Sequence, residues 1–410
     1  MAHVSYCRDG DLAALQAYCT QAGVTAAQVR DSLDLQIACA NGHLTVACWL
    51  QQTFQLTARD ARAMGNLALH TACDSGHLAV ARWLQQTFQL SAADARAADN
   101  YALHRACAHG HLEVARWLQQ TFQLTAADAR AYDNCALRGA CMYGHLEVVQ
   151  WLQQTFQLTA SDARAENNYA LRRACEYGHL EVARWLQQTF QLTATDAQAD
   201  DNHALLWAYK NGHLEIARWL QQTFQLTTSD ARSQGNYALR GACSNGHLNV
   251  ARWLHQTFQL TVVDARVGNN FALRVACEHG HLEVASWLQQ TFRLTAADAR
   301  MMNDYALQCA CEYGHLEILR WLQRTWGIPP DAQATAAMNI SMPETCAAYL
   351  HGLRTLRWSP RAHADFPLHA RRLALLLLLV NQRLAREPDG LPYLPPELWL
   401  LILSFLPAWW

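Results

Sequence analysis

The chain has almost no lysine, very little net charge and no long apolar segment. Lys210 is the single lysine among its 32 basic residues, and the formal net charge is −2. A charge so close to zero creates no overall field that would draw nucleic acid or an anionic membrane to the protein, so we expect neither as a partner. The longest uninterrupted apolar run, Leu373–Val380, is far shorter than the ~20 residues of a membrane-spanning helix, and we expect no such helix.

The first residues also lack the pattern of a secretory signal. The stretch MAHVSYCRDGDLAA has no basic region followed by an apolar one, so we expect no export. With 14 cysteines and no such signal, the chain is expected to lie in a reducing compartment, and we expect an intracellular location, cytoplasmic or nuclear. The composition, 51% hydrophobic and 16% charged, excludes a collagen-like or wholly disordered chain.

What the sequence does contain is an internal repeat. The tripeptide Gly-His-Leu recurs nine times at a constant spacing of 34 residues, at Gly42, Gly76, Gly110, Gly144, Gly178, Gly212, Gly246, Gly280 and Gly314. A weaker start, Gly10-Asp11-Leu12, precedes the first copy. Such a period predicts a linear stack, in which each repeat buries its apolar face against its neighbours.

Each repeat has the apolar spacing of two helices. In the third repeat Leu103, Ala106 and Cys107 fall on one face of a short helix, which we call helix A. Gly110 is expected to end helix A in the left-handed conformation, which costs glycine little. A second helix, helix B, is expected from about Leu112.

An asparagine stands just before helix A in most repeats, and an aspartate replaces it once. These residues are Asn66, Asn100, Asn134, Asn168, Asn202, Asn236, Asn270 and Asp304. We expect this residue to be the N-cap of helix A, accepting a hydrogen bond from the first turn. Because Asn and Asp both accept such a bond, the exchange at Asp304 is expected to have no effect.

The linker between repeats carries the pattern Ser/Thr-x-x-Asp. The pairs are Thr57–Asp60, Ser91–Asp94, Thr125–Asp128, Thr159–Asp162, Thr193–Asp196, Thr227–Asp230, Thr261–Asp264 and Thr295–Asp298. This is the pattern of a capping box, with Asp where Glu is commoner. Ala-Arg follows in seven cases and Ala-Gln once. We therefore expect one extra helical turn in each linker.

The repeated sequence resembles the ankyrin-repeat family. GHLEVARWL is similar to the start of that family's second helix, and YALRxAC occupies the place of its T-P-L-H-x-A-A motif. Tetratricopeptide repeats share the 34-residue period, but their Gly and Pro positions are absent from this sequence. The resemblance extends over about residues 33–326 and implies a solenoid that binds other proteins.

Three departures from the family pattern modify the expected fold. The period is 34 instead of 33, Tyr-Ala replaces Thr-Pro, and Gln replaces the Gly after helix B, as at Gln123. Together with the capping box, these departures predict an all-α, ankyrin-like helical repeat solenoid. In it, short helical turns replace the β-hairpin fingers, and a helical hairpin ends the chain.

Four residue types recur in register and could suggest chemistry. Cysteines one repeat apart lie roughly 10 Å from each other, too far for a disulfide, and are expected to be small buried residues. We expect the Gly-His-Leu histidine to stabilise a turn by a hydrogen bond, and the helix-B tryptophan to belong to the core. Arginines follow the linker aspartates, which favours a salt-bridged face over a phosphate-binding one. No catalytic, cofactor or metal site is expected, and no enzyme activity.

Two sets of positions vary among the repeats, near the end of helix A and just before Gly-His-Leu. Positions that packing determines should repeat, whereas positions free for binding can vary. From these sets we select five candidate contacts for a target protein, because aromatic residues and arginine dominate interface hot spots: Arg105, Tyr143, Arg173, Tyr177 and Trp207. Neutral variation at solvent-facing positions is the alternative.

The domain organisation follows from where the repeat stops. Residues 1–327 are expected to form the solenoid of about nine to ten repeats, 328–365 a degenerate repeat or linker, and 366–410 a helical tail. The end of the tail resembles the first helix of an F-box, with matching residues Leu394, Pro395, Glu397, Leu398, Ile402, Leu403 and Leu406. In that family these residues bind an adaptor of a cullin ubiquitin ligase.

Two further interpretations of the tail stay open. A SOCS-type box that recruits elongin has a similar two-helix form, and a helical hairpin could simply cap the exposed end of the solenoid. The lysine shortage would suit a ligase adaptor, because such a chain is a poor target for its own ubiquitin; a compositionally biased genome explains it equally. We therefore expect either a ligase substrate receptor or a binding scaffold with no ubiquitin link.

Overall fold

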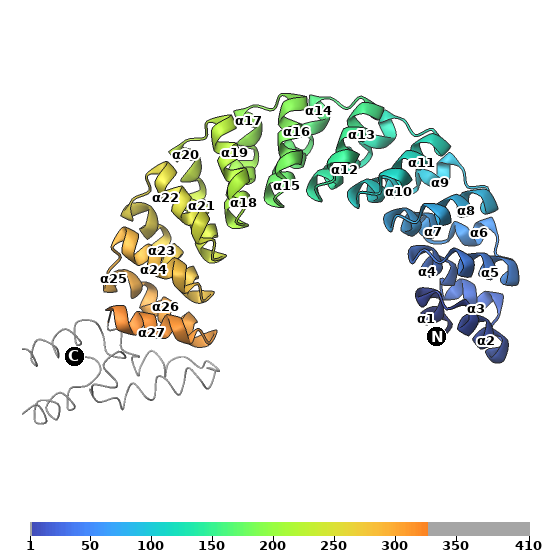
Figure 1. Cartoon of the computed structure of the whole chain (residues 1–410), viewed down its shortest axis with the longest axis horizontal. Coiled ribbons are helices and arrows are strands. Elements are labelled where there is room, and N and C mark those ends of the chain that lie inside the picture. Colours follow the sequence, from blue (N-terminus) through green and yellow to red (C-terminus); the bar gives the residue numbers. More distant parts are fainter. Residues whose placement is uncertain (1, 327–410) are drawn as a thin grey trace, which may run out of the picture. The chain divides into compact units, whose positions relative to one another are not determined.

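The structure is a computed structural model that describes residues 2–326. In that range it contains 27 helices and no strand (Figure 1). The expected all-α repeat fold is confirmed, and so are the short helices in place of β-hairpin fingers. The segments 328–365 and 366–410, with the predicted tail hairpin and Leu394–Leu406, lie outside the described residues.

The helices are of three kinds. The A helices are α1 (Ala2–Asp9), α4 (Asp34–Ala40), α7 (Ala63–Asp74), α10 (Ala97–Ala108), α12 (Ala126–Met142), α15 (Ala165–Glu176), α18 (Ala199–Lys210), α21 (Ser233–Ser244), α23 (Val262–Glu278) and α26 (Met301–Glu312). The B helices are α2 (Leu12–Ala22), α5 (Leu44–Phe54), α8 (Leu78–Phe88), α11 (Leu112–Phe122), α13 (Leu146–Phe156), α16 (Leu180–Phe190), α19 (Leu214–Phe224), α22 (Leu248–Phe258), α24 (Leu282–Phe292) and α27 (Leu316–Trp326). The linker helices are α3 (Ala26–Asp31), α6 (Ala58–Ala61), α9 (Ala92–Ala95), α14 (Ala160–Ala163), α17 (Ala194–Ala197), α20 (Thr228–Ala231) and α25 (Ala296–Ala299). In α12 and α23 the linker helix and the A helix run together across a kink.

The chain divides into two compact units built from the same repeat. The first contains residues 1–205 and 218–225, and the second contains residues 206–217 and those from 226 onward. Within the first unit, α7, α10, α12 and α15 form one row, and α8, α11, α13 and α16 form a second row beside it (Figure 1). The core lies between the rows, where helix-A residues such as Leu103 and helix-B residues such as Leu118 are fully buried.

Helix A ends as the sequence predicts. After α10, Gly110 has φ +77°, the His111 N–H donates to the Ala106 carbonyl at 2.8 Å, and the Gly110 N–H donates to the Cys107 carbonyl at 3.2 Å. These two bonds form a Schellman closure. A second constraint adds to the first, because a Cβ at Gly110 would lie 2.5 Å from Nδ1 of His145 in the next repeat.

The Gly-His-Leu histidine joins its own repeat to the one before. His111 Nε2 lies 3.0 Å from the Asp74 carbonyl oxygen, and His315 Nε2 lies 2.8 Å from that of Glu278. Burial lowers the pKa of His111, so its ring is uncharged near neutral pH and Nε2 donates to the carbonyl. The expected turn-stabilising bond is confirmed, and the turn that it stabilises belongs to the preceding repeat.

We expect Gly110→Ala to lower the free energy of unfolding by about 2 kcal/mol. A residue with a Cβ loses about 1 kcal/mol in the left-handed region, and displacement of the His145 ring adds to that loss. Urea unfolding followed by circular dichroism measures the change. Gly65→Ala is the matched control, because φ is +68° there and nothing lies within 4 Å of the added Cβ. Equal losses at the two glycines would contradict the role assigned to the histidine contact.

The linker aspartate holds two repeats together. Asp128 Oδ2 accepts hydrogen bonds from the Thr125 N–H at 2.7 Å and the Thr125 hydroxyl at 3.0 Å, which completes the predicted capping box. Arg96 from the preceding repeat donates from Nε to Oδ1 at 2.7 Å and from Nη2 to Oδ2 at 3.1 Å. The expected salt-bridged face is confirmed in the pairs Arg30–Asp60, Arg62–Asp94, Arg96–Asp128, Arg130–Asp162, Arg164–Asp196, Arg232–Asp264 and Arg266–Asp298.

A left-handed turn, which the sequence did not lead us to predict, interrupts the first part of each A helix after α4. Before α10's helical turns, Ala98, Asp99 and Asn100 have φ of 52°, 54° and 63°. A left-handed residue with a Cβ is strained, but Gly, Asn and Asp tolerate this region. Gly, Asn or Asp occupies the second position of the turn in every such repeat, and Asn or Asp the third. This recurrence of Gly, Asn and Asp is the sequence pattern from which the left-handed turn could have been predicted.

The prediction that this asparagine is the N-cap of helix A is wrong. Oδ1 of Asn100 is buried and accepts no hydrogen bond within the described residues, because the asparagine is itself the last left-handed residue. At two equivalent positions the asparagine amide instead donates to the next repeat: Nδ2 of Asn236 and of Asn270 lies 3.3 Å from Oδ1 of Asp264 and Asp298 respectively. The position 28 residues after Asp304 is Ala332, outside the described residues, so the expected neutrality of the exchange at Asp304 is not tested.

The glutamine that replaces the family's glycine after helix B adopts the glycine conformation. Gln123 ends α11 with φ 50° and ψ 50°. We expect Gln123→Gly to raise the free energy of unfolding by up to about 1 kcal/mol, because glycine removes the left-handed strain. Differential scanning calorimetry measures the shift in Tm. The same substitution at exposed Gln120, inside α11, should destabilise by about 1 kcal/mol; a loss at both positions would contradict the expectation.

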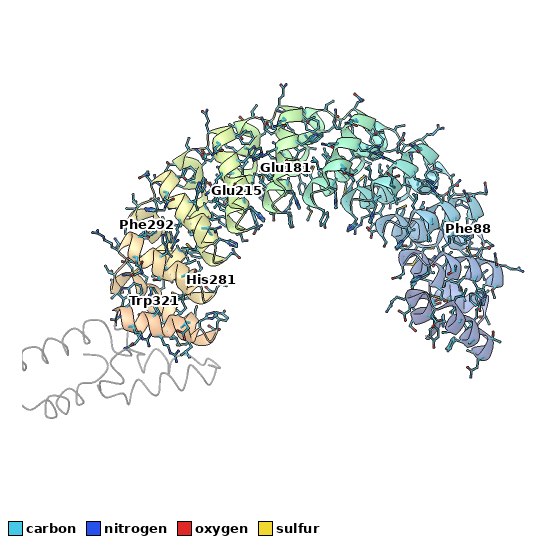
Figure 2. All side chains as sticks on the ribbon, viewed as in Figure 1. Phe88, Glu181, Glu215, His281, Phe292 and Trp321 are labelled. Atoms are coloured by element: carbon cyan, nitrogen blue, oxygen red, sulfur yellow. The ribbon has the colours of Figure 1, made fainter. Side chains whose placement is uncertain are left out.

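The cysteine prediction is confirmed and the tryptophan prediction is largely wrong. Cys107 and its equivalents are fully buried free thiols, and burial raises the pKa of Cys107. Among the helix-B tryptophans of the described residues, only Trp117 is buried, and the others are half-buried. Each packs edge-on against an aromatic ring five residues later; Phe88, labelled in Figure 2, is the partner of Trp83. The fully buried residue is the following leucine, so the tryptophans border the core.

Candidate target-binding surface

The five candidate contacts lie at equivalent places, at or just after the end of an A helix. Arg105 is in α10, Tyr143 follows α12, Arg173 is in α15 and Tyr177 follows it; all four belong to the first compact unit. Trp207 is in α18 and belongs to the second unit. We call these helix ends, with the turns that follow them, the A-end surface.

One cluster of the A-end surface surrounds Asp74. Arg105 donates from Nε to Asp74 Oδ1 at 2.8 Å, and His109 Nε2 lies 3.1 Å from the same oxygen. The His109 ring stacks on Tyr143 with centroids 5.7 Å apart, and Tyr143 is 46% exposed. The cluster therefore offers an aromatic face beside an oriented ion pair. Arg105 and Tyr143 were among the predicted contacts, whereas Asp74 and His109 were not.

A second cluster surrounds Tyr169. The guanidinium carbons of Arg138 and Arg173 each lie 4.7 Å from the Tyr169 ring centroid. Arg173 also forms an ion pair with Glu176 in its own helix. Tyr177, one residue later, is 43% exposed and available to a partner. Arg173 is thus held in place by its own chain, whereas Tyr177 presents its ring to solvent.

The second unit contributes two places. The Trp207 ring is half-buried, and Lys210 Nζ lies 3.9 Å from its centroid, a distance at which a cation is attracted to the ring. Further along, Glu278, His279, Tyr313 and His315 line a hollow of about 460 Å³ at the ends of α23 and α26. None of these four was among the predicted contacts. Glu278, His279 and Tyr313 stand at the variable positions just before Gly-His-Leu, which could have indicated them, whereas His315 belongs to the invariant tripeptide.

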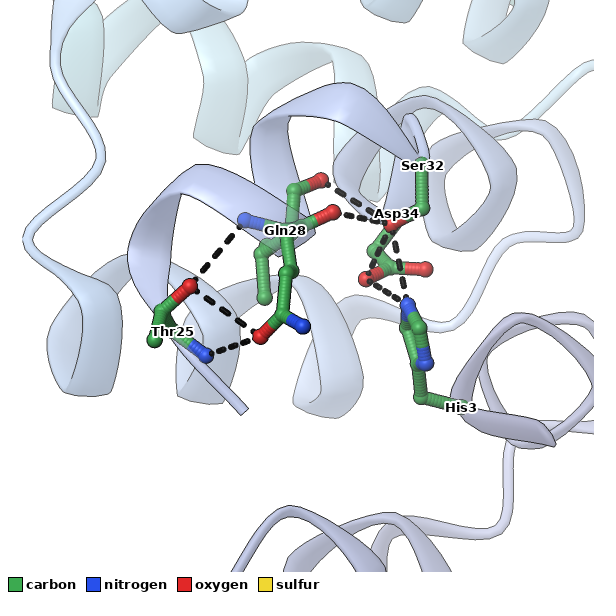
Figure 3. A network of polar contacts seen from close by, with 6 residues as sticks. His3, Thr25, Gln28, Ser32 and Asp34 are labelled. Carbon is green, nitrogen blue, oxygen red and sulfur yellow. Dashed lines mark hydrogen bonds and ion pairs between the residues drawn. The ribbon is translucent and has the colours of Figure 1, made fainter. Parts of the chain in front are cut away.

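A buried polar group near the N-terminus has the residue types of a catalytic triad but not its geometry. Asp34 is fully buried, accepts a hydrogen bond from the Ser32 hydroxyl at 2.8 Å, and lies 3.4 Å from His3 Nε2 (Figure 3). Ser32 Oγ approaches the same Nε2, at 3.1 Å. A relay needs the serine and the aspartate on different ring nitrogens. The group therefore joins α1 to α4 and does not activate a nucleophile.

Within residues 2–326, no group of three or more His, Cys, Asp or Glu side chains is arranged to hold a metal ion. Over the same part of the chain, no helix combines the length and the apolar character needed to cross a bilayer.

A comparison with protein-family models finds one matching family. The family model described as Ankyrin repeats (3 copies) matches residues 35–132, 87–162, 137–230, 173–264, 205–298 and 239–334. These overlapping matches extend over 35–334, more than half of the chain. No family model supports the F-box-like segment Leu394–Leu406. No curated protein matches the chain in a sequence search.

Proposed function

This chain belongs to the ankyrin-repeat family, a family of protein–protein interaction modules, and we propose that its A-end surface binds a target protein. One observation carries the proposal: the repeats differ at the A-end surface, whereas their B helices are nearly the same from one repeat to the next. The segment Trp-Leu-Gln-Gln-Thr-Phe recurs along the B helices, whereas one helix-A position holds, in order, Thr71, Arg105, Gly139, Arg173, Trp207, Gly241, Val275 and Cys309.

The chemistry of the surface supports the same conclusion. Tyr143 and Tyr177 are exposed, and exposed aromatic rings beside oriented arginines are typical of interface hot spots. Arg105 is preorganised by Asp74, so a partner would lose little side-chain entropy in ordering it. The B helices instead present repeated, interleaved charges, such as the pair Arg116–Glu113 at 3.2 Å.

The test is the capture of a target by the full chain from lysate, compared among three proteins. The surface variant is Tyr143→Ala with Tyr177→Ala. The control is Glu147→Ala with Glu181→Ala, two exposed B-helix positions, of which Glu181 is labelled in Figure 2. We expect the wild type and the control to retain the same protein, and the surface variant to retain about tenfold less. Equal retention by all three would overturn the proposal.

We further propose that the C-terminal segment links the captured target to a cullin ubiquitin ligase. The support is the spacing of Leu394, Pro395, Leu398 and Ile402 and the shortage of lysine. The test is binding of a purified F-box adaptor to the full chain and to the variant Leu398→Ala with Leu403→Ala, with Tyr393→Ala as the control.

Two other outcomes of that test replace the F-box assignment. Binding of elongin in place of the F-box adaptor would assign the tail to the SOCS type. If neither protein binds and deletion of residues 394–410 lowers the melting temperature, the tail is a structural cap, and the chain is a binding scaffold without a ubiquitin link.

A further inference from the structure

The hollow in the second unit has walls that its own chain holds in place. The Tyr313 and His315 ring centroids are 6.4 Å apart, and Tyr313 is 54% exposed. His315 is fixed by Nε2, which lies 2.8 Å from the Glu278 carbonyl, and His279 is fixed by Nδ1, which lies 2.9 Å from the Val275 carbonyl. The hollow is therefore a preformed feature, because each histidine ring is tied to the backbone.

The groups that line the hollow accept hydrogen bonds. A ring nitrogen that bonds to a carbonyl oxygen must carry hydrogen, so the other nitrogen of an uncharged ring is an acceptor. Nε2 of His279 is such an acceptor, and the Glu278 carboxylate is another, whereas Nδ1 of His315 lies against Gly280. The charges of Glu312 and Glu278 raise the pKa of Tyr313, a further sign of negative potential. A donor-rich cation is the complementary occupant.

Within residues 2–326, no cationic side chain fills the hollow. Arg274, in α23, donates to the carbonyls of Asn269 at 2.9 Å and Gly268 at 3.1 Å, and so closes its own left-handed turn. Glu278 Oε2 accepts a hydrogen bond from the Tyr305 hydroxyl at 3.4 Å, a long contact with a neutral group. Among the described residues that line the hollow, none is an arginine or a lysine.

In the first unit, an arginine side chain occupies the position equivalent to this hollow. Residues 204 positions apart are equivalent, six repeats of 34, so Asp74, His109 and His111 correspond to Glu278, Tyr313 and His315. Between them in the first unit lies Arg105, whose guanidinium bonds both oxygens of Asp74, at 2.8 and 3.4 Å. Its equivalent in the second unit is Cys309, which is small and 4% exposed. The second unit therefore has the carboxylate of this pair, at Glu278, but a cysteine at the position of the arginine.

We infer that this hollow takes an arginine side chain of the target protein, in the position that Arg105 occupies beside Asp74. The inference rests on the proposed function, since it names the chemistry that the A-end surface recognises in a target. The guanidinium lies against the Tyr313 ring and donates to the Glu278 carboxylate. The binding energy comes from an ion pair and a cation–π contact in a preformed site.

Ligand-observed NMR on the full chain tests the inference with a single-arginine probe. The probe is Nα-acetyl-arginine methylamide, and its neutral isostere with citrulline in place of arginine is the matched ligand control. We expect saturable binding of the arginine compound at millimolar concentration and about tenfold weaker binding of the citrulline compound. Glu278→Gln should weaken arginine binding by a similar factor.

Two protein variants separate this site from general attraction to acidic surface. Cys309→Arg places the cation of the first unit inside the chain and should abolish binding, and Glu181→Gln makes the same charge change as Glu278→Gln on α16 and should leave binding unchanged. Equal binding of both compounds, or unchanged binding in Glu278→Gln and Cys309→Arg, would overturn the inference. In that case target capture that still depends on Tyr143 and Tyr177 would leave the proposed function standing.

Discussion

Asp128→Ala is expected to lower the free energy of unfolding by about 3 kcal/mol, more than any substitution on the exposed surface. The carboxylate accepts two hydrogen bonds from Thr125 at the start of its helix and two from Arg96 of the preceding repeat. Loss of the cap costs about 1 kcal/mol, and loss of charge-assisted bonds to an arginine costs about 2 kcal/mol. Asp128 is 7% exposed, so water replaces these bonds poorly.

The chain offers its own control for this substitution. Gln198 stands where the other linkers have arginine, so Arg96→Gln reproduces a natural exchange and leaves the Thr125 cap intact. Urea unfolding should give Arg96→Gln less than half the loss of Asp128→Ala, because Arg96 is 39% exposed in its side chain and water can replace part of its bonding. Equal losses would mean that the cap contributes nothing and would contradict the double role of Asp128.

The elements that the sequence predicts are those that depend on apolar spacing and on local capping. Leu103, Ala106 and Cys107 are fully buried because a helix brings residues three and four apart onto one face, and that geometry needs no tertiary information. The linker helices follow in the same way from Thr125 and Asp128, whose bonds close within one turn. The left-handed turn was missed because Asn100 satisfies the N-cap preference and the left-handed preference equally well.

The candidate site could be predicted only in part, for a reason of register. The variable positions are visible in the sequence, but Asp74 meets Arg105 across two repeats, 31 residues apart. That offset depends on the relative positions of neighbouring A helices along their axes. The 34-residue period gives no information about these positions. Without it, Glu278 and Cys309 cannot be recognised as an ion-pair site that lacks its cation. The partial exposure of the helix-B tryptophans could not be predicted for the same reason, because burial of a side chain at the edge of a helix face depends on where the neighbouring helix lies.

Acidification from pH 6.5 to pH 4 is expected to destabilise the protein strongly. His104 is 5% exposed. Burial lowers its pKa from 6.5 to about 4; the charge of Asp99 opposes this shift more weakly, and that of Arg138 adds to it slightly. The unfolded chain therefore binds this proton at a higher pH than the folded chain. Stability falls as pH drops from 6.5 to about 4, by about 3 kcal/mol for His104 alone.

Other histidines act in the same direction, and the linker aspartates add a later stage. Burial lowers the pKa of these histidines too: His70, His111, His145, His179, His247 and His281. Burial opposes ionisation of Asp128, but bonds from Arg96 and Thr125 outweigh it and lower its pKa from 3.8 to about 2. Its stabilisation is present above pH 3.8 and is lost as pH falls towards 2. The free energy of unfolding should thus fall in two stages.

His104→Leu isolates the first stage. Leu206 occupies the equivalent position in its own repeat, and His104 Nε2 is buried without a hydrogen-bond partner in the described residues, so leucine should cost little at pH 7.5. Urea unfolding at pH 7.5 and pH 4.5 should show a loss for His104→Leu that is smaller than the wild-type loss by about 2 kcal/mol. A wild-type loss that persists undiminished in His104→Leu would place the acid sensitivity elsewhere. Ring-proton NMR of His104 checks the cause directly, since its titration midpoint should lie near pH 4.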